Sequence, residues 1–336
     1  MQKHNNTKKI QTHITLIILT TSNTISYIQQ IPPTQKPTNH LTKDKTSAIT
    51  PKPTNNYTTT YTQDDLNNLT GNVLRPNGII WHNNHLYTAC TGDWTIYQVN
   101  DSTGSTITYN FGIRNAQTIY AENNNNNKLE LWIPDFETGT LFYIDENNRR
   151  NTITTNLNRP WGITAINSQE FLITELRNNS ATLVSRDGHA REIINNLASP
   201  TGISKDANYL YIANNGDPNR AIEWFTIEEI TQNRTINASS PNTQRSLVSG
   251  IQNITGITLA NDNNLYFAYA LGTRGVIGRI NPDHCREIGG CNQNEIDIIV
   301  YTDLAAPLAG LTLSPDMRLF IHTMFDPTIY WVQIES

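Results

Sequence analysis

The sequence predicts an all-β protein, a six-bladed β-propeller made of four-stranded antiparallel blades. Two observations support this prediction: the residue composition, and a unit that recurs along the chain after about residue 65. Of the 336 residues 16% are charged, and Asn and Thr together fill about a quarter of the positions. Because Asn and Thr favour turns, caps and strands over helix interiors, this composition disfavours a helical bundle.

The recurring unit begins with a short strand in which a Gly precedes an apolar residue. It continues through a polar turn into a second apolar strand, such as Leu86–Ala89 or Leu210–Ala213. Six copies can be traced, and the second is degenerate because it lacks the Gly. Their first strands begin at Arg75–Ile79, Asn115–Ile119, Arg159–Ile163, Ser199–Ile203, Ile254–Ile257 and Leu308–Leu311. Four short strands in about 40 to 50 residues are typical of propeller blades.

The positions of Gly and of the apolar runs fit blades that are covered on both faces. A Pro-x-Gly start allows the backbone to approach its neighbours closely near a crowded central axis. Most copies continue into third and fourth strands, as at Ile96–Val99 and Thr106–Tyr109. Apolar runs on both faces are expected where each blade packs between two others.

The last copy ends at its third strand, Ile329–Val332. A closed ring then needs its missing outer strand from the other end of the propeller sequence. The segment Tyr57–Thr62 is rich in Tyr and Thr, which favour strands. We therefore expect an N-terminal strand from this segment to close the ring.

The domain prediction has three parts: an export leader over residues 1–30, a Thr- and Pro-rich linker over 31–56, and the propeller over 57–336. The leader has a basic start, at Lys3, Lys8 and Lys9, and a short apolar stretch, Ile14–Leu19. That stretch is too short to be a transmembrane span. The alternative is a disordered polar tail. With a leader, the protein is expected to be secreted or periplasmic, and tethered if the leader is not cleaved.

The three cysteines and the charge balance narrow the chemistry. Cys285 and Cys291 flank a turn-like segment and can form a disulfide, with two unlinked thiols as the alternative. Cys90 lies in an apolar run and is expected to be a buried small hydrophobe. With 24 basic against 29 acidic side chains, the chain lacks the positive charge that nucleic-acid binding requires.

On the Gly-Ile and Leu-Tyr pieces of the recurring unit, most of residues 66–336 resembles the six-bladed propellers of the NHL-repeat and SMP-30/gluconolactonase-like superfamily. The resemblance implies a fold shared by calcium-dependent lactonases and esterases, by lyases and by non-catalytic binding proteins. In the hydrolases, a divalent cation sits in the central channel on Glu, Asn and Asp ligands from inner strands. The cofactor that the resemblance implies is therefore Ca²⁺.

The position before the inner-strand Gly tests that implication. The six residues there include no carboxylate, although a Ca²⁺ site usually needs negative charge. They are Asn77, Gln117, Trp161, Thr201, Thr255 and Ala309. The polar members Asn77, Gln117, Thr201 and Thr255 remain candidates for channel lining and ligand binding.

A second set of equivalent positions lies near the end of each second strand. There the second, third and fourth copies carry Asp135, Glu175 and Asn214. If these side chains converge, they form a candidate metal or acid–base cluster. The alternative is that each one caps a turn through its own backbone.

Two functions follow. The first is an exported propeller, non-catalytic or accessory, that binds a small molecule, glycan or protein on one face of the ring. The second is a metal-dependent lactonase or esterase in which Asp135, Glu175 and Asn214 hold the cation. The absence of carboxylates before the inner-strand Gly favours the first function.

Overall fold

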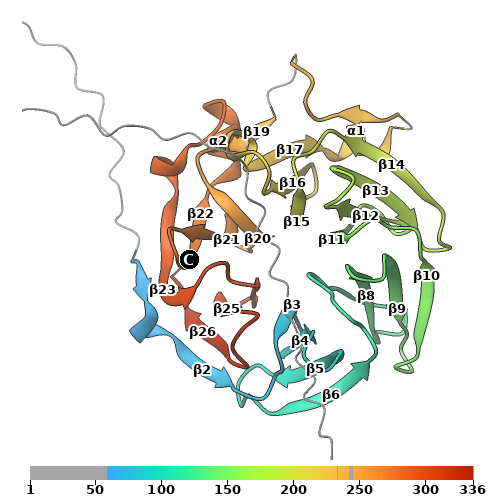
Figure 1. Cartoon of the computed structure of the whole chain (residues 1–336), viewed down its shortest axis with the longest axis vertical. Coiled ribbons are helices and arrows are strands. Elements are labelled where there is room, and N and C mark those ends of the chain that lie inside the picture. Colours follow the sequence, from blue (N-terminus) through green and yellow to red (C-terminus); the bar gives the residue numbers. More distant parts are fainter. Residues whose placement is uncertain (1–58, 233, 242–244, 336) are drawn as a thin grey trace, which may run out of the picture. The chain divides into compact units, whose positions relative to one another are not determined.

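The computed structural model describes residues 59–335, apart from 233 and 242–244. The predicted leader and linker therefore lie outside the described residues. The described chain forms six sheets arranged as blades around a central axis, each built on four antiparallel strands with one inner strand toward the centre (Figure 1). The prediction of a six-bladed propeller is confirmed.

The strands follow the chain around the ring, blade by blade. Blade 1 contains β3 (Pro76–His82), β4 (His85–Cys90), β5 (Thr95–Asn100) and β6 (Thr106–Phe111). Blade 2 contains β7 (Tyr120–Asn123), β8 (Leu129–Asp135), β9 (Thr140–Ile144) and β10 (Arg150–Thr154). Blade 3 contains β11 (Pro160–Ala165), β12 (Glu170–Glu175), β13 (Ser180–Ser185) and β14 (Ala190–Asn195), with β18 (Ile236–Asn237) added in parallel at its outer edge.

The second half of the ring repeats this order. Blade 4 contains β15 (Pro200–Lys205), β16 (Tyr209–Asn214), β17 (Ile222–Thr226) and β19 (Ser246–Val248). Blade 5 contains β20 (Gln252–Leu259), β21 (Leu265–Leu271), β22 (Arg274–Ile280) and β23 (Asp297–Ala305). Blade 6 contains β24 (Gly310–Leu313), β25 (Arg318–His322), β26 (Ile329–Gln333) and β2 (Asn67–Thr70).

Helices are short and lie in the connections. Among the described residues, the α-helices are α1 (Ile227–Thr231) and α2 (Pro282–Glu287), and the 3-10 helices are η1 (Gln63–Asp65), η2 (Pro218–Arg220) and η3 (Gln293–Glu295). Helix α2 begins the segment closed by the Cys285–Cys291 disulfide, whose Cα atoms are 5.0 Å apart. The predicted disulfide is thus present, and Cys90 is a buried free thiol, as expected.

The ring is closed by a strand that precedes blade 1, but the prediction that this strand is Tyr57–Thr62 was wrong. The fourth strand of blade 6 is β2, which pairs antiparallel with β26, with Asn67 opposite Trp331. Of the predicted segment Tyr57–Thr62, residues 57 and 58 lie outside the described residues. Its last two residues form β1 (Tyr61–Thr62), which pairs in parallel with β23 at the outer edge of blade 5.

The hydrophobic core is divided among the interfaces between blades. Each of the six buried clusters combines side chains from neighbouring blades, as where Phe320 of β25 packs with Leu86 of β4. At the axis, the backbones of inner strands approach so closely that a side chain would not fit. A Cβ atom on Gly202 would lie 2.8 Å from the backbone nitrogen of Ile257 in blade 5. The Gly of the recurring unit is therefore required by packing.

Candidate functional site

Asp135, Glu175 and Asn214 end the second strands of three successive blades and are all buried. Each side chain accepts a hydrogen bond from the backbone N–H of a residue that leads into its own blade. The donors are Arg114 at 2.7 Å, Asn158 at 2.7 Å and Ala198 at 3.1 Å, respectively. These contacts tie the end of the second strand to the entry of the first, between residues 16 to 21 positions apart in the chain.

The remaining polar atoms of the three side chains also have partners within their own blades. The other Asp135 oxygen accepts from the N–H groups of Glu137 and Thr138, and the Glu175 carboxylate accepts from the Thr182 hydroxyl at 2.5 Å. The Asn214 amide donates to Glu223 at 2.8 Å. Within the described chain, no group of three or more His, Cys, Asp or Glu side chains could hold a metal ion. The calcium prediction gains no support from these contacts.

The residues before the inner-strand Gly hold neighbouring blades together. The Thr201 hydroxyl donates to the Ile254 carbonyl of the next blade at 2.7 Å, and the Thr255 hydroxyl does the same to Leu308. Asn77 and Gln117 each donate an amide hydrogen to Asn115 at 2.9 Å. Of the four predicted channel residues, Gln117 also lines the central cavity described below.

Trp161 links blade 3 to blade 5 near the start of the inner strands. It lies where the pairing register of β11 with β12 shifts, between Pro160 and Ile163. The indole N–H donates to the Thr255 carbonyl at 3.0 Å. Because Trp161 belongs to blade 3 and Thr255 to blade 5, the indole spans the inner end of blade 4.

A ring of aliphatic side chains follows immediately after the Gly positions. All six are at most 8% exposed, and every blade contributes one. They are Ile79, Ile119, Ile163, Ile203, Ile257 and Leu311. This aliphatic ring makes the middle of the channel apolar.

Beyond the aliphatic ring, the inner strands enclose a cavity of about 180 Å³. We call this cavity the axial cup. All six inner strands contribute to it, and its wall carries polar side chains from blades 2 to 6. These residues are Tyr120, Thr164, Ser204, Lys205, Thr258 and Thr312, and Gln117 and Thr118 of blade 2 also line the cavity.

Two hydroxyls of the axial cup link adjacent blades. Ser204 Oγ accepts a hydrogen bond from the Leu259 backbone N–H at 2.9 Å, and Thr312 Oγ1 accepts from the Trp81 N–H at 3.1 Å. Both are second residues after the Gly of the recurring unit. Lys205 is the third residue after Gly202, and Tyr120 occupies the second position in the degenerate copy. The recurring unit thus repeats a polar position around the cup.

Sequence reasoning missed the polar wall of the axial cup. It compared the residues before the Gly and those at the ends of the second strands. The signal was two residues after each Gly, where five of the six copies carry a hydroxyl: Tyr120, Thr164, Ser204, Thr258 and Thr312. Comparing that position across the six copies would have identified the polar wall of the cup.

The comparisons with known proteins establish the fold. No family model matches the sequence, and no curated protein matches it. Among solved structures, a gluconolactonase from Xanthomonas campestris is 13% identical, with a TM-score of 0.59 over 80% of this chain and 89% of that one. The calcium-binding protein regucalcin from Agrobacterium tumefaciens is 12% identical, with a TM-score of 0.58 over 82% and 96%.

A third similar structure carries a different activity. The PQQ-bound aldose sugar dehydrogenase from Streptomyces coelicolor is 11% identical, with a TM-score of 0.59 over 80% of this chain and 97% of that one. At these identities the likeness concerns the propeller fold alone, which hosts several chemistries. In the described part of the chain, none of the helices is both long and apolar enough to cross a membrane.

Proposed function

We propose that the propeller binds a small molecule in the axial cup. The observation that supports this proposal is the cup itself, an apolar base with a polar wall at the point where all six inner strands meet. Ligand sites in proteins are concave and mostly apolar, with a few convergent polar groups. The volume of about 180 Å³ suits a ligand of few heavy atoms, since an apolar cavity of about 150 Å³ binds benzene.

A substitution that fills the axial cup with a large side chain tests this proposal. Thr258 lines the axial cup, so Thr258→Tyr should occupy the space that a ligand needs. Thr108→Tyr, on the exposed side of β6, is the matched control. A library of small molecules is screened against the full chain by ligand-observed NMR. Hits that bind the native chain and the control but not Thr258→Tyr support the proposal; hits that bind all three equally contradict it.

A second candidate is a metal-dependent lactonase or esterase, with calcium as its cofactor. It is favoured by two structures with this fold, a gluconolactonase and a calcium-binding regucalcin. Against it, the oxygens of Asp135 and Glu175 accept hydrogen bonds within their own blades. Calcium titration followed by thermal shift tests the candidate: stabilisation at millimolar calcium, together with lactone hydrolysis, would support it.

Export is part of the proposal. The Cys285–Cys291 disulfide is compatible with an oxidising compartment, where such bonds form and persist. We propose that residues 1–30 direct secretion or periplasmic export and that 31–56 link this leader to the propeller. Fractionation of cells that express the full chain or a chain without residues 1–30 tests this, because only the full chain should leave the cytosol.

A further inference from the structure

The axial cup carries one positive charge and no negative charge among its lining residues. Lys205 is its only ionisable group besides the Tyr120 phenol. The chain has nine lysines, of which seven lie at or before residue 52, and Lys128 and Lys205 are the two in the propeller. One of the two propeller lysines therefore lies at the central cavity.

The Lys205 ammonium makes one long hydrogen bond. Its Nζ donates to the Asp206 backbone carbonyl at a long 3.4 Å, and it forms no ion pair with a carboxylate of the described residues. The neighbouring Asp206 carboxylate accepts from the Asn208 and Tyr209 N–H groups and from the Tyr211 hydroxyl. Because an ammonium has three hydrogens to donate, Lys205 retains donors for another partner.

The hydroxyls of the cup are poised as donors as well. A Ser or Thr hydroxyl has one hydrogen and two lone pairs. Ser204 and Thr312 each use a lone pair to accept a backbone N–H, so their own hydrogens remain free to point elsewhere. Burial raises the pKa of Tyr120, so its phenol stays protonated at neutral pH and can also donate. The wall is thus rich in donors.

We propose that the ligand of the axial cup is a small monocarboxylate with an apolar body. This inference rests on the proposed function and names its ligand class. The carboxylate binds at Lys205, with further hydrogen bonds from the hydroxyls of the wall, and the apolar body rests on the aliphatic ring that includes Ile203. A dianion such as phosphate fits less well, since it would bring two charges to one ammonium and polar oxygens to an apolar base.

Binding to the full chain is measured by titration calorimetry with benzoate and butyrate and with their neutral amides. We expect each carboxylate to bind at least tenfold more tightly than its amide. Lys205→Met should weaken benzoate at least tenfold and leave benzamide unchanged, whereas Lys205→Arg should keep most of the benzoate affinity. Lys128→Met, in an exposed turn, is the matched control and should change nothing. Thermal melts confirm that each variant is folded.

The outcomes separate this inference from the proposed function. Equal binding of acid and amide, with both blocked by Thr258→Tyr, would overturn the carboxylate inference and leave the cup as a binding site. Tighter binding of inorganic phosphate than of benzoate, or no carboxylate binding at all, would also overturn the inference. Carboxylate binding that is insensitive to both Thr258→Tyr and Lys205→Met would contradict the proposed function and the inference together.

Discussion

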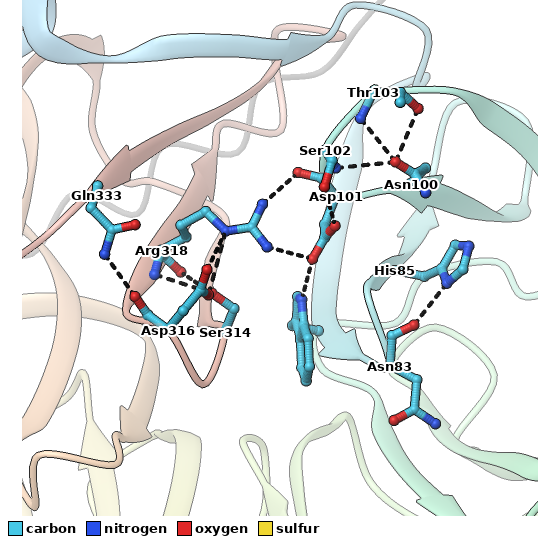
Figure 2. Close-up of polar contacts among 11 residues, drawn as sticks. Asn83, His85, Asn100, Asp101, Ser102, Thr103, Ser314, Asp316, Arg318 and Gln333 are labelled. Carbon is cyan, nitrogen blue, oxygen red and sulfur yellow. Dashed lines mark hydrogen bonds and ion pairs between the residues drawn. The ribbon is translucent and has the colours of Figure 1, made fainter.

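The Arg318 guanidinium donates to the Asp101 carboxylate at 2.7 Å and to the Asp101 backbone carbonyl at 2.8 Å (Figure 2). Arg318 begins β25 in the last blade, and Asp101 follows β5 in the first blade. Asp101 is 2% exposed and also accepts from the Trp81 indole at 2.7 Å. The seam where the ring closes is therefore held by a buried ion pair in addition to the pairing of β2 with β26.

Loss of the arginine should destabilise this seam. Arg318→Met leaves the buried Asp101 carboxylate without its cation, which we expect to lower the free energy of unfolding by about 3 kcal/mol. The double variant Arg318→Met, Asp101→Asn should recover part of the loss, because it removes the unpaired charge. Urea denaturation measures both. Arg114→Met breaks a pair with Glu137 in which both side chains are about half exposed, and it serves as control, with an expected loss below about 1 kcal/mol. Equal losses in Arg318→Met and the control would contradict the assignment.

The close approach of inner strands makes a second prediction. A Cβ on Gly202 would meet the backbone of blade 5 at 2.8 to 3.2 Å, and backbone atoms cannot move aside cheaply. Gly202→Ala should therefore cost about 2 kcal/mol of stability. Gly71→Ala is the control, because nothing lies within 4 Å of its added Cβ, and its effect should stay within about 0.5 kcal/mol. Thermal and urea unfolding distinguish the two, and a neutral Gly202→Ala would show that the inner strands can separate.

The assignment of the closing strand can be tested by truncation. A chain that begins at Leu66 lacks β1 but retains β2, and a chain that begins at Gly71 lacks both. We expect the first chain to keep most of its cooperative unfolding. The second should lose several kcal/mol, because the edge of β26 and the partly buried Trp331 would be exposed. A large loss already in the first chain would instead make β1 the critical strand.

Local patterns predicted the repeated parts of the fold and misplaced its closure. The Gly-Ile pieces located the inner strands because backbone crowding at the axis imposes the same requirement on nearly every blade. Strand β2, with the sequence Asn-Asn-Leu-Thr, has a weak strand preference of its own. Its conformation is set by pairing with β26, a contact between residues more than 250 positions apart, whereas Tyr61 and Thr62 have the stronger local preference.

The candidate site also has a part that local sequence predicts and a part that it does not. The turn-capping interpretation fits Asp135, which accepts from the N–H groups of Glu137 and Thr138 in the turn that follows it, because such a cap depends on nearby residues. Glu175 instead accepts from the N–H of Asn158, 17 residues earlier, and local sequence does not indicate that contact. The axial cup could not be predicted in this way. It forms only because the inner strands of six blades bring the residue two positions after each Gly to one axis. Trp161 shows the limit most plainly: its partner, Thr255, is 94 residues away and two blades further along.

A buried histidine should make the propeller sensitive to acid. His322 is fully buried in β25, its Nε2 has no hydrogen-bond partner among the described residues, and burial lowers its pKa to about 4 from an ordinary 6.5. The unfolded chain therefore binds a proton at higher pH than the folded chain does. Stability should fall as pH drops from about 6.5 to about 4, by about 3 kcal/mol in total from this group.

The variant His322→Gln isolates that contribution. Urea denaturation at several pH values between 7 and 4 should show a steeper loss for the native chain than for His322→Gln, once both are referred to their own stability at pH 7. His189→Gln is the control, since the His189 side chain is 91% exposed and its replacement should leave the slope unchanged. Carboxylates that lose their partners in acid act equally in all three chains, so they cancel from the comparison. Parallel slopes for the native chain and His322→Gln would mean that His322 does not resist protonation in the folded state.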